Sequence, residues 1–244
     1  MKEWITGRNP VYETLTAQRR HFFRLWLALG VKIEGRIEQA LKLAKERHVL
    51  VETVARDKLD KIYYNHQGIG LEASAYPYAA LEDLIYNSKN RQEAPLFLVL
   101  DLIQDPQNLG TLLRSAESLG VHGVVIASAR GALITPAVVN ASSGASEHLL
   151  IAQHNLVQAL EKMKANNAWV VGLDEDTTSK TPNQLDLNMG LAMVVGNEGS
   201  GLRNLVKKSC DELLRLPMVG KVESLNAAVA GSIALFLARQ ARSL

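Results

Sequence analysis

The sequence has 244 residues, enough for one large domain or two modest ones. Its 47% hydrophobic residues provide a core and its 21% charged residues can cover that core, which is typical of a soluble globular protein. There is no apolar stretch of about 18 residues and no apolar N-terminal segment, so we expect neither a membrane span nor a secretory signal. Cys210 is the only cysteine, which excludes an internal disulfide and a thiolate zinc cluster and favours a cytoplasmic location.

The net charge of +2 is unevenly distributed. Residues 1–93 contain 15 Lys+Arg and 12 Asp+Glu, whereas residues 94–244 contain 12 and 13. Arg19, Arg20 and Arg24 lie close together in the basic part. A basic face attracts phosphate backbones, although an ordinary solvated surface would have the same pattern.

The first 75 residues alternate between strand and helix patterns. Short apolar or β-branched runs predict strands, and apolar residues at helical spacing predict helices. The predicted strands are 22–29, 49–54 and 68–73, and the predicted helices are 10–15, 33–44 and 57–63. We therefore predict a small α/β domain over residues 1–75.

Residues 76–94 have the composition of a linker. Pro77 and Pro95 bracket the segment, and residues 87–93 form a polar run. A short helix is predicted inside it, at 81–86. We place the domain boundary in this linker.

From Pro95 onward, continuous apolar runs indicate strands that are buried on both faces. These strands alternate with helices, which predicts a parallel sheet covered by helices on both sides. The predicted strands are 96–100, 121–127, 169–173, 191–195 and 213–216, and the predicted helices are 109–119, 156–163 and 225–242. Residues 95–244 therefore form a second, larger α/β domain.

Ligands of open α/β sheets bind beyond the carboxyl ends of the strands. Three predicted loops there combine glycine or proline with polar side chains, at 101–110, 196–201 and 217–226. The loop at 196–201 fits a nucleotide cradle, but also a tight turn that needs glycine. It is neither a dinucleotide fingerprint nor a phosphate-binding loop of nucleoside triphosphatases.

Other candidate sites are weaker. Asp101 and Asp105 could form a catalytic carboxylate pair, but Asp105 precedes a proline and fits a turn or helix cap better. The six histidines lack ligand spacing, so no metal site is expected. Ser224 lacks the context of a hydrolase nucleophile, and Cys210 has no neighbouring base, so we interpret Cys210 as structural.

Taken together, the three loops resemble the motifs of the SpoU (TrmH) family of RNA 2′-O-ribose methyltransferases, in the SPOUT superfamily. Asn108-Leu109-Gly110 with Arg114-Ser115-Ala116 and Gly120 resembles the first motif. Gly196-Asn197-Glu198-Gly199-Ser200-Gly201 resembles the second motif. Leu216-Pro217-Met218 followed by Ser224-Leu225-Asn226-Ala227 resembles the third motif. The motifs occur in family order over about residues 96–240.

The N-terminal part resembles the small L30e-like RNA-binding domain that precedes the catalytic domain in RlmB-type ribosomal RNA enzymes. Gly7-Arg8-Asn9-Pro10-Val11 and His66-Gln67-Gly68-Ile69 carry this looser resemblance. The neighbouring Tyr63-Tyr64-Asn65 matches no pattern that we can assign.

The resemblance implies a trefoil-knotted domain, a homodimer with an active site drawn from both subunits, and S-adenosylmethionine as cofactor. The cofactor would be held by five residues of the second and third motifs: Gly196, Gly201, Leu216, Met218 and Leu225. The catalytic group would comprise Asn108, Arg114, Glu198, Ser224 and Asn226. The implied substrate is large-subunit ribosomal RNA, at a guanosine near the peptidyl-transferase centre.

The role of Arg114 stays open, because a free guanidinium remains protonated. Arg114 either acts as a base after desolvation near other cations, or fixes a phosphate and stabilises the developing oxyanion while water takes the proton. Two other functions stay open as well. One is methylation of transfer RNA, and the other is a non-catalytic RNA-binding role in ribosome assembly. Retention of the implied catalytic residues favours the enzyme.

Overall fold

The computed structural model describes residues 2–91, 93–176, 178–221 and 224–242. Its internal contacts divide the chain into two units, one of Met1–Pro77 with Leu133–His148 and the other of Tyr78–Ala132 with Leu149–Leu244. Within the described residues, no helix is both long and apolar enough to cross a membrane.

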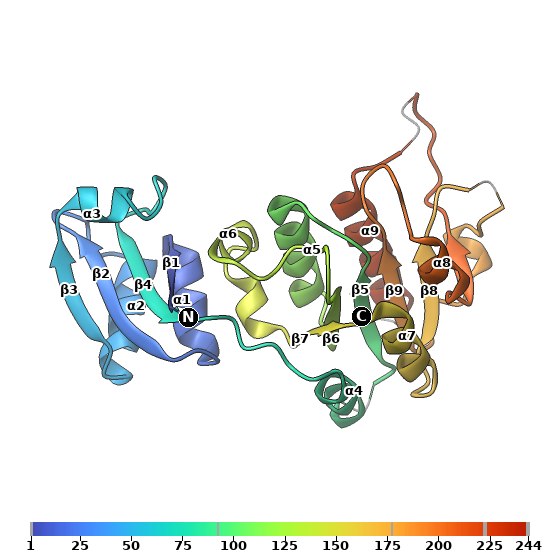
Figure 1. Cartoon of the computed structure of the whole chain (residues 1–244), viewed down its shortest axis with the longest axis horizontal. Coiled ribbons are helices and arrows are strands. Elements are labelled where there is room, and N and C mark those ends of the chain that lie inside the picture. Colours follow the sequence, from blue (N-terminus) through green and yellow to red (C-terminus); the bar gives the residue numbers. More distant parts are fainter. Residues whose placement is uncertain (1, 92, 177, 222–223, 243–244) are drawn as a thin grey trace. The chain divides into compact units, whose positions relative to one another are not determined.

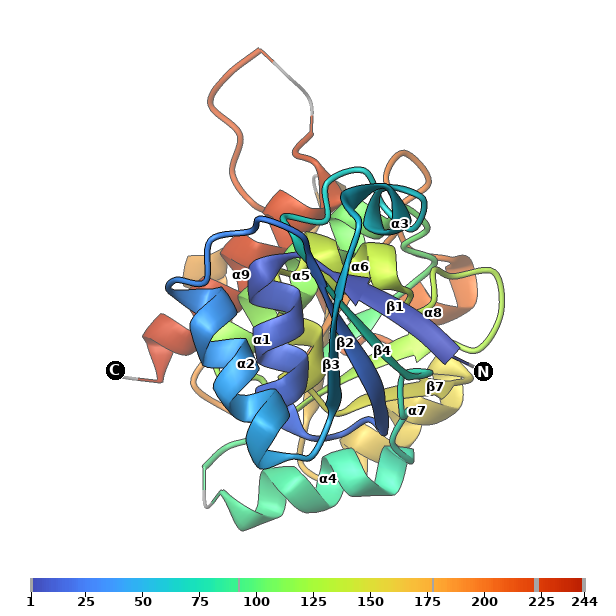
Figure 2. The ribbon, with the colours of Figure 1, turned by 90° about the vertical axis from the view of Figure 1, so that its left-hand side faces the viewer.

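The first unit contains a mixed four-stranded sheet, in the order β1-β4-β2-β3 (Figure 1). β4 is antiparallel to both β1 and β2, whereas β2 and β3 are parallel. The strands are β1 (Lys2–Thr6), β2 (Phe22–Ala28), β3 (Leu50–Val54) and β4 (Ile69–Ser74). The helices are α1 (Arg8–Ala17), α2 (Arg36–Glu46), α3 (Arg56–Asp60), α6 (Pro136–Ala141) and the short 3-10 helix η1 (Ala145–His148). Figure 2 shows α1 and α2 side by side over this sheet.

Leu133–His148 belongs to the first unit because it packs on α1 and β1. Glu147 is almost fully buried and forms a bidentate ion pair with Arg20, at 2.8 Å to both Nε and Nη2. Glu3 accepts a further bond from Arg20 Nη1 at 2.7 Å. Removing one partner of such a buried pair leaves an uncompensated charge, which is strongly destabilising.

The sequence left open whether Arg19, Arg20 and Arg24 form a basic face, and in the structure all three are bonded within the first unit. Arg20 is buried between carboxylates, and Arg24 pairs with Glu72 at 3.0 Å. Arg19 donates to the Tyr76 hydroxyl at 2.9 Å. These arginines lie close together because they hold the unit together, not because they face a ligand.

The second unit contains six parallel strands, in the order β10-β8-β9-β5-β6-β7 (Figure 1). The predicted α/β class with a parallel sheet is confirmed. The strands are β5 (Leu96–Leu100), β6 (Gly123–Ala127), β7 (Ile151–His154), β8 (Trp169–Leu173), β9 (Leu191–Val195) and β10 (Glu212–Leu214). Every residue of β5, β6 and β9 is buried, as continuous apolar runs require.

Helices cover both faces of this sheet. α4, α7 and α8 contribute to one continuous apolar core, and α5 and α9 pack together on the sheet as well. The helices are α4 (Leu81–Asn90), α5 (Pro106–Ser118), α7 (Leu156–Lys164), α8 (Asn204–Lys208), α9 (Ala227–Ala241) and the 3-10 helix η2 (Pro182–Gln184). Gly231 of α9 lets that helix approach closely, since a Cβ there would lie 2.5 Å from the Leu112 side chain.

The observed division differs from the predicted domains in two places. Residues 133–148 belong to the first unit instead of the second. Within the predicted linker 76–94, α4 packs against β6 of the second unit, and a Cβ on Gly123 would lie 2.3 Å from Leu84. An amphipathic helix inside a polar segment thus belongs to a core, not to a linker.

Candidate active site

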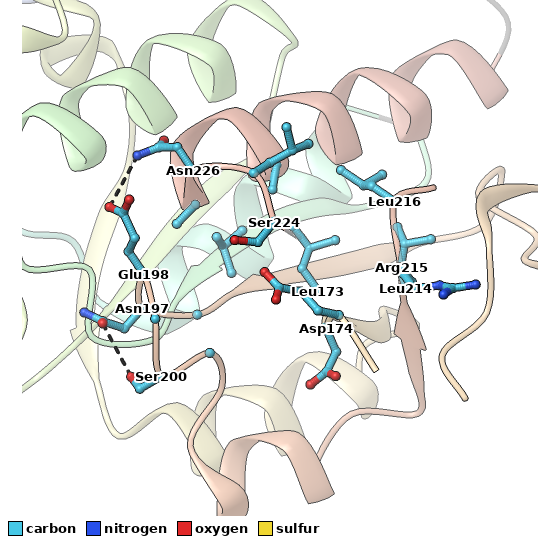
Figure 3. Close-up of a pocket in the computed structure, with 18 of the residues that line it drawn as sticks. Leu173, Asp174, Asn197, Glu198, Ser200, Leu214, Arg215, Leu216, Ser224 and Asn226 are labelled. Carbon is cyan, nitrogen blue, oxygen red and sulfur yellow. Dashed lines mark hydrogen bonds between the residues drawn. The ribbon is translucent and has the colours of Figure 1, made fainter. Parts of the chain in front are cut away.

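The central strands β5 and β9 lie where the strand order of the second unit reverses. From β5, the chain continues outward through β6 and β7, then crosses to β8 and returns to β9 between β8 and β5. At the carboxyl ends beyond this point lies a cavity of about 640 Å³ (Figure 3). It is lined by the ends of β8, β9 and β10, the loops that follow β9 and β10, and the first turn of α9. Such a switch point is where open α/β sheets bind ligands.

The glycine-rich loop after β9 turns back tightly on itself. Asn197 and Gly201 exchange two backbone hydrogen bonds, at 3.1 and 2.9 Å. Gly199 and Gly201 have positive φ angles of 89° and 63°, which favour glycine. A Cβ on Gly196 would lie 2.4 Å from the backbone carbon of Gly201, so no other residue fits without moving the loop. The loop is therefore a tight turn and also a wall of the cavity.

Two aspartates fix the loops around this turn. Asp101 follows β5, is fully buried, and accepts bonds from the backbone N (2.8 Å) and Nε (2.6 Å) of Arg203. Asp105 caps α5 by accepting from the backbone N–H groups of Gln107 and Asn108. The cap interpretation of Asp105 is confirmed. Both carboxylates are used in structural bonds, which leaves no Asp101–Asp105 catalytic pair.

Asn108, Glu198 and Asn226 form a hydrogen-bonded cluster at the edge of the cavity. Asn108 Nδ2 donates to Glu198 Oε2 at 3.1 Å, and Asn226 Nδ2 donates to Asn108 Oδ1 at 3.0 Å and to Glu198 Oε2 at 3.4 Å. Figure 3 shows the Asn226 amide and the Glu198 carboxylate pointing toward each other. Residues far apart in the sequence therefore meet here, one from each of the three predicted loops.

Asn226 has a second task, because it is also the N-cap of α9. Its Oδ1 accepts from the backbone N–H groups of Ala228 and Val229, at 2.9 and 3.2 Å. The cap fixes the orientation of the amide, so that its Nδ2 must point toward Asn108 and Glu198. Helix capping and site assembly thus depend on the same side chain.

Most of the other predicted site residues also reach this cavity. Ser224, Leu225, Leu216 and Met218 line it together with Gly196 and Gly201. Arg114 does not line it in this chain. It lies on α5 with an exposed side chain, one residue before Ser115, which bonds Ser232 of α9 at 2.7 Å.

The sequence analysis missed three polar residues that line the cavity: Asp174, Glu175 and Arg215. Asp174 and Glu175 directly follow β8, and Arg215 directly follows β10. Applying the carboxyl-end rule to the predicted strand 169–173 would have found Asp174 and Glu175. Arg215 falls inside the predicted strand 213–216 and follows a strand only because β10 ends at Leu214. Asp174 is held by Lys207 Nζ at 2.7 Å, while no ion pair is found for Glu175 in the part of the chain that the structure describes.

Cys210 is half-buried and lies outside the cavity lining. Burial raises the pKa of its thiol to about 12. The protonated thiol is a poor nucleophile, consistent with the structural interpretation. Among the described residues, no group of three His, Cys, Asp or Glu side chains could hold a metal ion.

Comparison with known families identifies the family of this chain. Residues 95–236 match the SpoU rRNA Methylase family, and residues 4–79 match the family model for RNA 2′-O ribose methyltransferase substrate binding. The chain belongs to the SpoU methyltransferase family. It is therefore an S-adenosylmethionine-dependent RNA 2′-O-methyltransferase, and the resemblance of the three motifs is confirmed.

Relatives of known sequence and structure support this assignment over the whole chain. A putative TrmH family tRNA/rRNA methyltransferase, YacO of Bacillus subtilis (strain 168), is 42% identical over 96% of this chain and 94% of that protein. The AdoMet-bound rRNA methyltransferase from Sinorhizobium meliloti has a TM-score of 0.79 and 25% identity, covering 98% of this chain and 87% of that one. The AdoMet complex of AviRb from Streptomyces viridochromogenes, at 23% identity and a TM-score of 0.80, supports the fold.

The cavity of this SpoU enzyme fits S-adenosylmethionine. Its volume of about 640 Å³ lies within the range of small-molecule sites, roughly 300–1,000 Å³. Gly196 has no side chain, so its backbone forms part of the cavity wall, and Leu216 and Leu225 contribute apolar side chains to the lining. The Glu175 carboxylate would complement a ligand that carries a sulfonium and an ammonium group, whereas Asp174 is already paired with Lys207.

Proposed function

We propose that this SpoU enzyme methylates a ribose 2′-hydroxyl of large-subunit ribosomal RNA, at a guanosine near the peptidyl-transferase centre. The observation that carries the proposal is the Asn108–Glu198–Asn226 cluster at the edge of the cavity. It would present one carboxylate of fixed orientation to an incoming hydroxyl. We place the reaction in the cytoplasm, the location that the sequence analysis favours.

The backbone of the glycine-rich loop and the side chains of Leu216, Met218 and Leu225 would hold the cofactor. When bound, S-adenosylmethionine supplies a methyl group on a good leaving group, so that the protein has to position the hydroxyl and manage its proton. As the family resemblance implies, we propose that this part of the chain forms a trefoil knot.

Glu198 would orient the ribose. Its Oε2 already accepts from two amides, while Oε1 accepts no hydrogen bond from the residues that the structure describes and can accept from a 2′-hydroxyl. The Ser224 hydroxyl, which also lines the cavity, would donate to or accept from the same ribose. Fixing the nucleophilic oxygen in line with the methyl group makes the bimolecular reaction effectively unimolecular.

Arg114 would act on the cavity of a second subunit. Its exposed position on α5, away from the cavity lining of its own chain, supports this arrangement. There it would either take the hydroxyl proton or fix the adjacent phosphate and stabilise the developing oxyanion, while water takes the proton. The two roles predict different effects of Arg114→Lys, because lysine retains the charge but loses the planar fork.

The homodimer that this requires has a suitable surface on α9. Val229, Ile233 and Phe236 are 45%, 38% and 50% exposed, and their spacing places them on one face of the helix. An exposed apolar stripe of this kind is typical of a protein interface. We therefore propose that two copies of this enzyme associate through α9 and the neighbouring α5.

Residues 4–79 match the family model for substrate binding, and this match supports the proposal that the substrate is RNA. The part of the first unit in selecting ribosomal RNA is best tested with point variants. Deleting residues 1–77 would leave Glu147 buried without Arg20 and would destabilise the rest of the first unit.

The experiment is a map of ribose methylation by mass spectrometry in RNA from a deletion strain. Complementation with the wild-type gene should restore one 2′-O-methylguanosine in large-subunit ribosomal RNA, and complementation with Glu198→Gln should not. Restoration of a transfer RNA methylation instead would refute the ribosomal assignment but not the reaction. Restored methylation by the Glu198→Gln gene would show that Glu198 is not required, and an unchanged methylation map in the deletion strain would indicate a non-catalytic role in ribosome assembly.

A further inference from the structure

The unassigned motif Tyr63-Tyr64-Asn65 lies in the loop between α3 and β4 of the first unit. The Tyr63 and Tyr64 rings pack against each other, with centroids 5.2 Å apart and planes inclined by 41°. Tyr64 is 80% exposed and Tyr63 is 36% exposed. The pair therefore presents aromatic surface to solvent instead of to the core of the unit.

This loop lies at one end of the four-stranded sheet, where three strands end and the fourth begins. β1 and β2 both run antiparallel to β4, and β3 runs parallel to β2. The carboxyl ends of β1, β2 and β3 therefore lie at the end of the sheet where β4 begins. α1 and α3 begin at this end as well, directly after β1 and β3. Figure 2 shows α3 and the loop that follows it at this end of the unit.

A cavity of about 460 Å³ opens at the same end. The side chains of Arg8, Arg56 and Gln67 line it, together with residues 28–31 and Gly68. Gln67 holds Arg8 in place, because its Oε1 accepts from the Arg8 backbone N at 3.0 Å and its carbonyl accepts from Arg8 Nε at 3.5 Å. Both arginines can therefore present guanidinium groups to a ligand in this cavity.

The two arginines differ from Arg20 and Arg24, which are paired with carboxylates. Within the described part of the chain, neither Arg8 nor Arg56 forms an ion pair. The loops and the short α3 at this end add further charges of both signs, and the cations outnumber the carboxylates. The cations are Arg8, Lys32, Arg56, Lys58 and Lys61, and the carboxylates are Glu34, Asp57 and Asp60. Asp57 lies 4.0 Å from Lys61 Nζ, and Asp60 accepts a hydrogen bond from His66 Nε2 at 3.1 Å, while His66 Nδ1 accepts from the backbone N of Gly68.

We propose that this tyrosine–arginine surface, made of Arg8, Arg56, Tyr63, Tyr64 and Gln67, binds an unpaired segment of the substrate RNA. A backbone phosphate would lie in the cavity between Arg8 and Arg56, and a nucleobase would stack on Tyr64. The inference rests on the proposed RNA substrate and adds the surface that holds it. Guanidinium groups suit phosphate, and exposed aromatic rings suit unstacked bases, so the combination favours single-stranded RNA over a duplex.

The test measures binding of the full-length enzyme to a fluorescent single-stranded RNA of about 12 nucleotides and to a duplex of the same sequence. Tyr64→Ala should weaken single-strand binding about tenfold, as expected for loss of one base-stacking contact, and Tyr64→Phe should retain it. Tyr86→Ala is the matched control, since Tyr86 on α4 is also exposed (67%) and belongs to the second unit.

Arg8→Ala and Arg56→Ala should each reduce the salt dependence of binding. For a single strand, each lost phosphate contact lowers the slope of log K against log salt by about 0.7. Lys45→Ala is the control, because Lys45 is an exposed cation of α2 without an ion pair in the described residues. Ultraviolet cross-linking should attach the RNA to Tyr63 or Tyr64, as mapped by mass spectrometry.

Equal binding by the wild type and Tyr64→Ala, or cross-links confined to other peptides, would overturn the inference. If the wild type still methylates ribosomal RNA in that case, the proposed function stands. Tighter binding of an acidic peptide than of the single-stranded RNA at equal charge would also overturn it, since it would indicate a protein partner. If the wild type neither binds nor methylates ribosomal RNA, the inference and the proposed function both fail.

Discussion

The two sheets of this enzyme differ in whether the polar side chains at their ends are bonded to other residues of the chain. At the carboxyl ends of the six-stranded sheet, Asp101, Asn108, Glu198 and Asn226 are all bonded to other residues of the chain. At the end of the four-stranded sheet, the arginines of the tyrosine–arginine surface have no carboxylate partner among the described residues. The first pattern is that of a preorganised reaction site, and the second is that of a surface whose charges are completed by a ligand.

This contrast predicts different responses to mutation. Changes in the cavity of the second unit should abolish a chemical step or cofactor binding, whereas changes at the tyrosine–arginine surface should weaken RNA binding by moderate factors. A cavity variant that only weakens RNA binding, or a tyrosine–arginine variant that loses the chemical step, would contradict this comparison.

Arg114→Ala should have the largest effect, a loss of methyl transfer of at least about 100-fold, comparable to removal of one donor to a developing oxyanion. Cofactor binding should persist, because Arg114 does not line the cavity of its own chain. Single-turnover methylation and calorimetry measure the two quantities. Mixing inactive Arg114→Ala and Glu198→Gln subunits should restore part of the activity if Arg114 acts across a dimer. Near-normal turnover by Arg114→Ala would remove this residue from the mechanism.

Gly196→Ala should reduce the affinity for S-adenosylmethionine by at least about tenfold. The added Cβ would lie 2.4 Å from backbone atoms of Gly201, so the wall of the cavity must move. Gly220→Ala is the control, since nothing lies within 4 Å of its added Cβ. Calorimetry in the presence of a chelator measures the affinities, and it also tests the prediction that binding requires no metal. Equal affinities for the two variants would show that the loop does not hold the cofactor.

Asn226→Ala and Asn226→Asp separate the cap of α9 from the site. Alanine removes the cap oxygen and the amide nitrogen, and loss of the cap should lower the free energy of unfolding by about 1–2 kcal/mol. Aspartate retains the cap oxygen but places a second carboxylate beside Glu198, so it should retain stability and lose activity. Thermal melts and turnover rates measure these effects. An active Asn226→Asp enzyme would contradict the role of the amide.

Cys210→Ser should have the smallest effect, leaving methyl transfer unchanged near neutral pH. Because burial raises the pKa of the folded thiol to about 12 from its ordinary value of 9.0, the unfolded thiol ionises first as the pH rises. The wild type should therefore lose stability above about pH 9, and Cys210→Ser should lose less. Native alkylation at pH 8 should be slow. Rapid alkylation at that pH would show that the thiol is accessible and ionised.

Continuous apolar runs made most strands of the second sheet predictable, but one strand of each sheet was missed. β1 of the first sheet begins with the charged residues Lys2 and Glu3, and β7 of the second sheet is a short edge strand with the sequence Ile-Ala-Gln-His. Both depend on pairing with partners that are distant in the sequence, β4 and β6. Local patterns carry no information about such partners.

The site was predictable to the extent that its residues occur in motifs. Asn108, Glu198 and Asn226 were named together, but their mutual hydrogen bonds depend on three loops that meet only in the fold. The arginines illustrate the opposite case. Arg19, Arg20 and Arg24 are close in sequence and are used internally, whereas Arg8 and Arg56 are 48 positions apart and line one cavity. Charge clustering in a sequence is therefore a poor guide to a binding surface.

The central claim is that the cavity at the carboxyl ends of β8, β9 and β10 supports methyl transfer to a ribose 2′-oxygen of ribosomal RNA. The most direct measurement is incubation of the purified enzyme with methyl-labelled S-adenosylmethionine and ribosomal RNA, followed by nuclease digestion and mass spectrometry of the nucleosides. The account predicts labelled 2′-O-methylguanosine from the wild type and none from Glu198→Gln. Label on a nucleobase, or equal ribose labelling by both proteins, would contradict it.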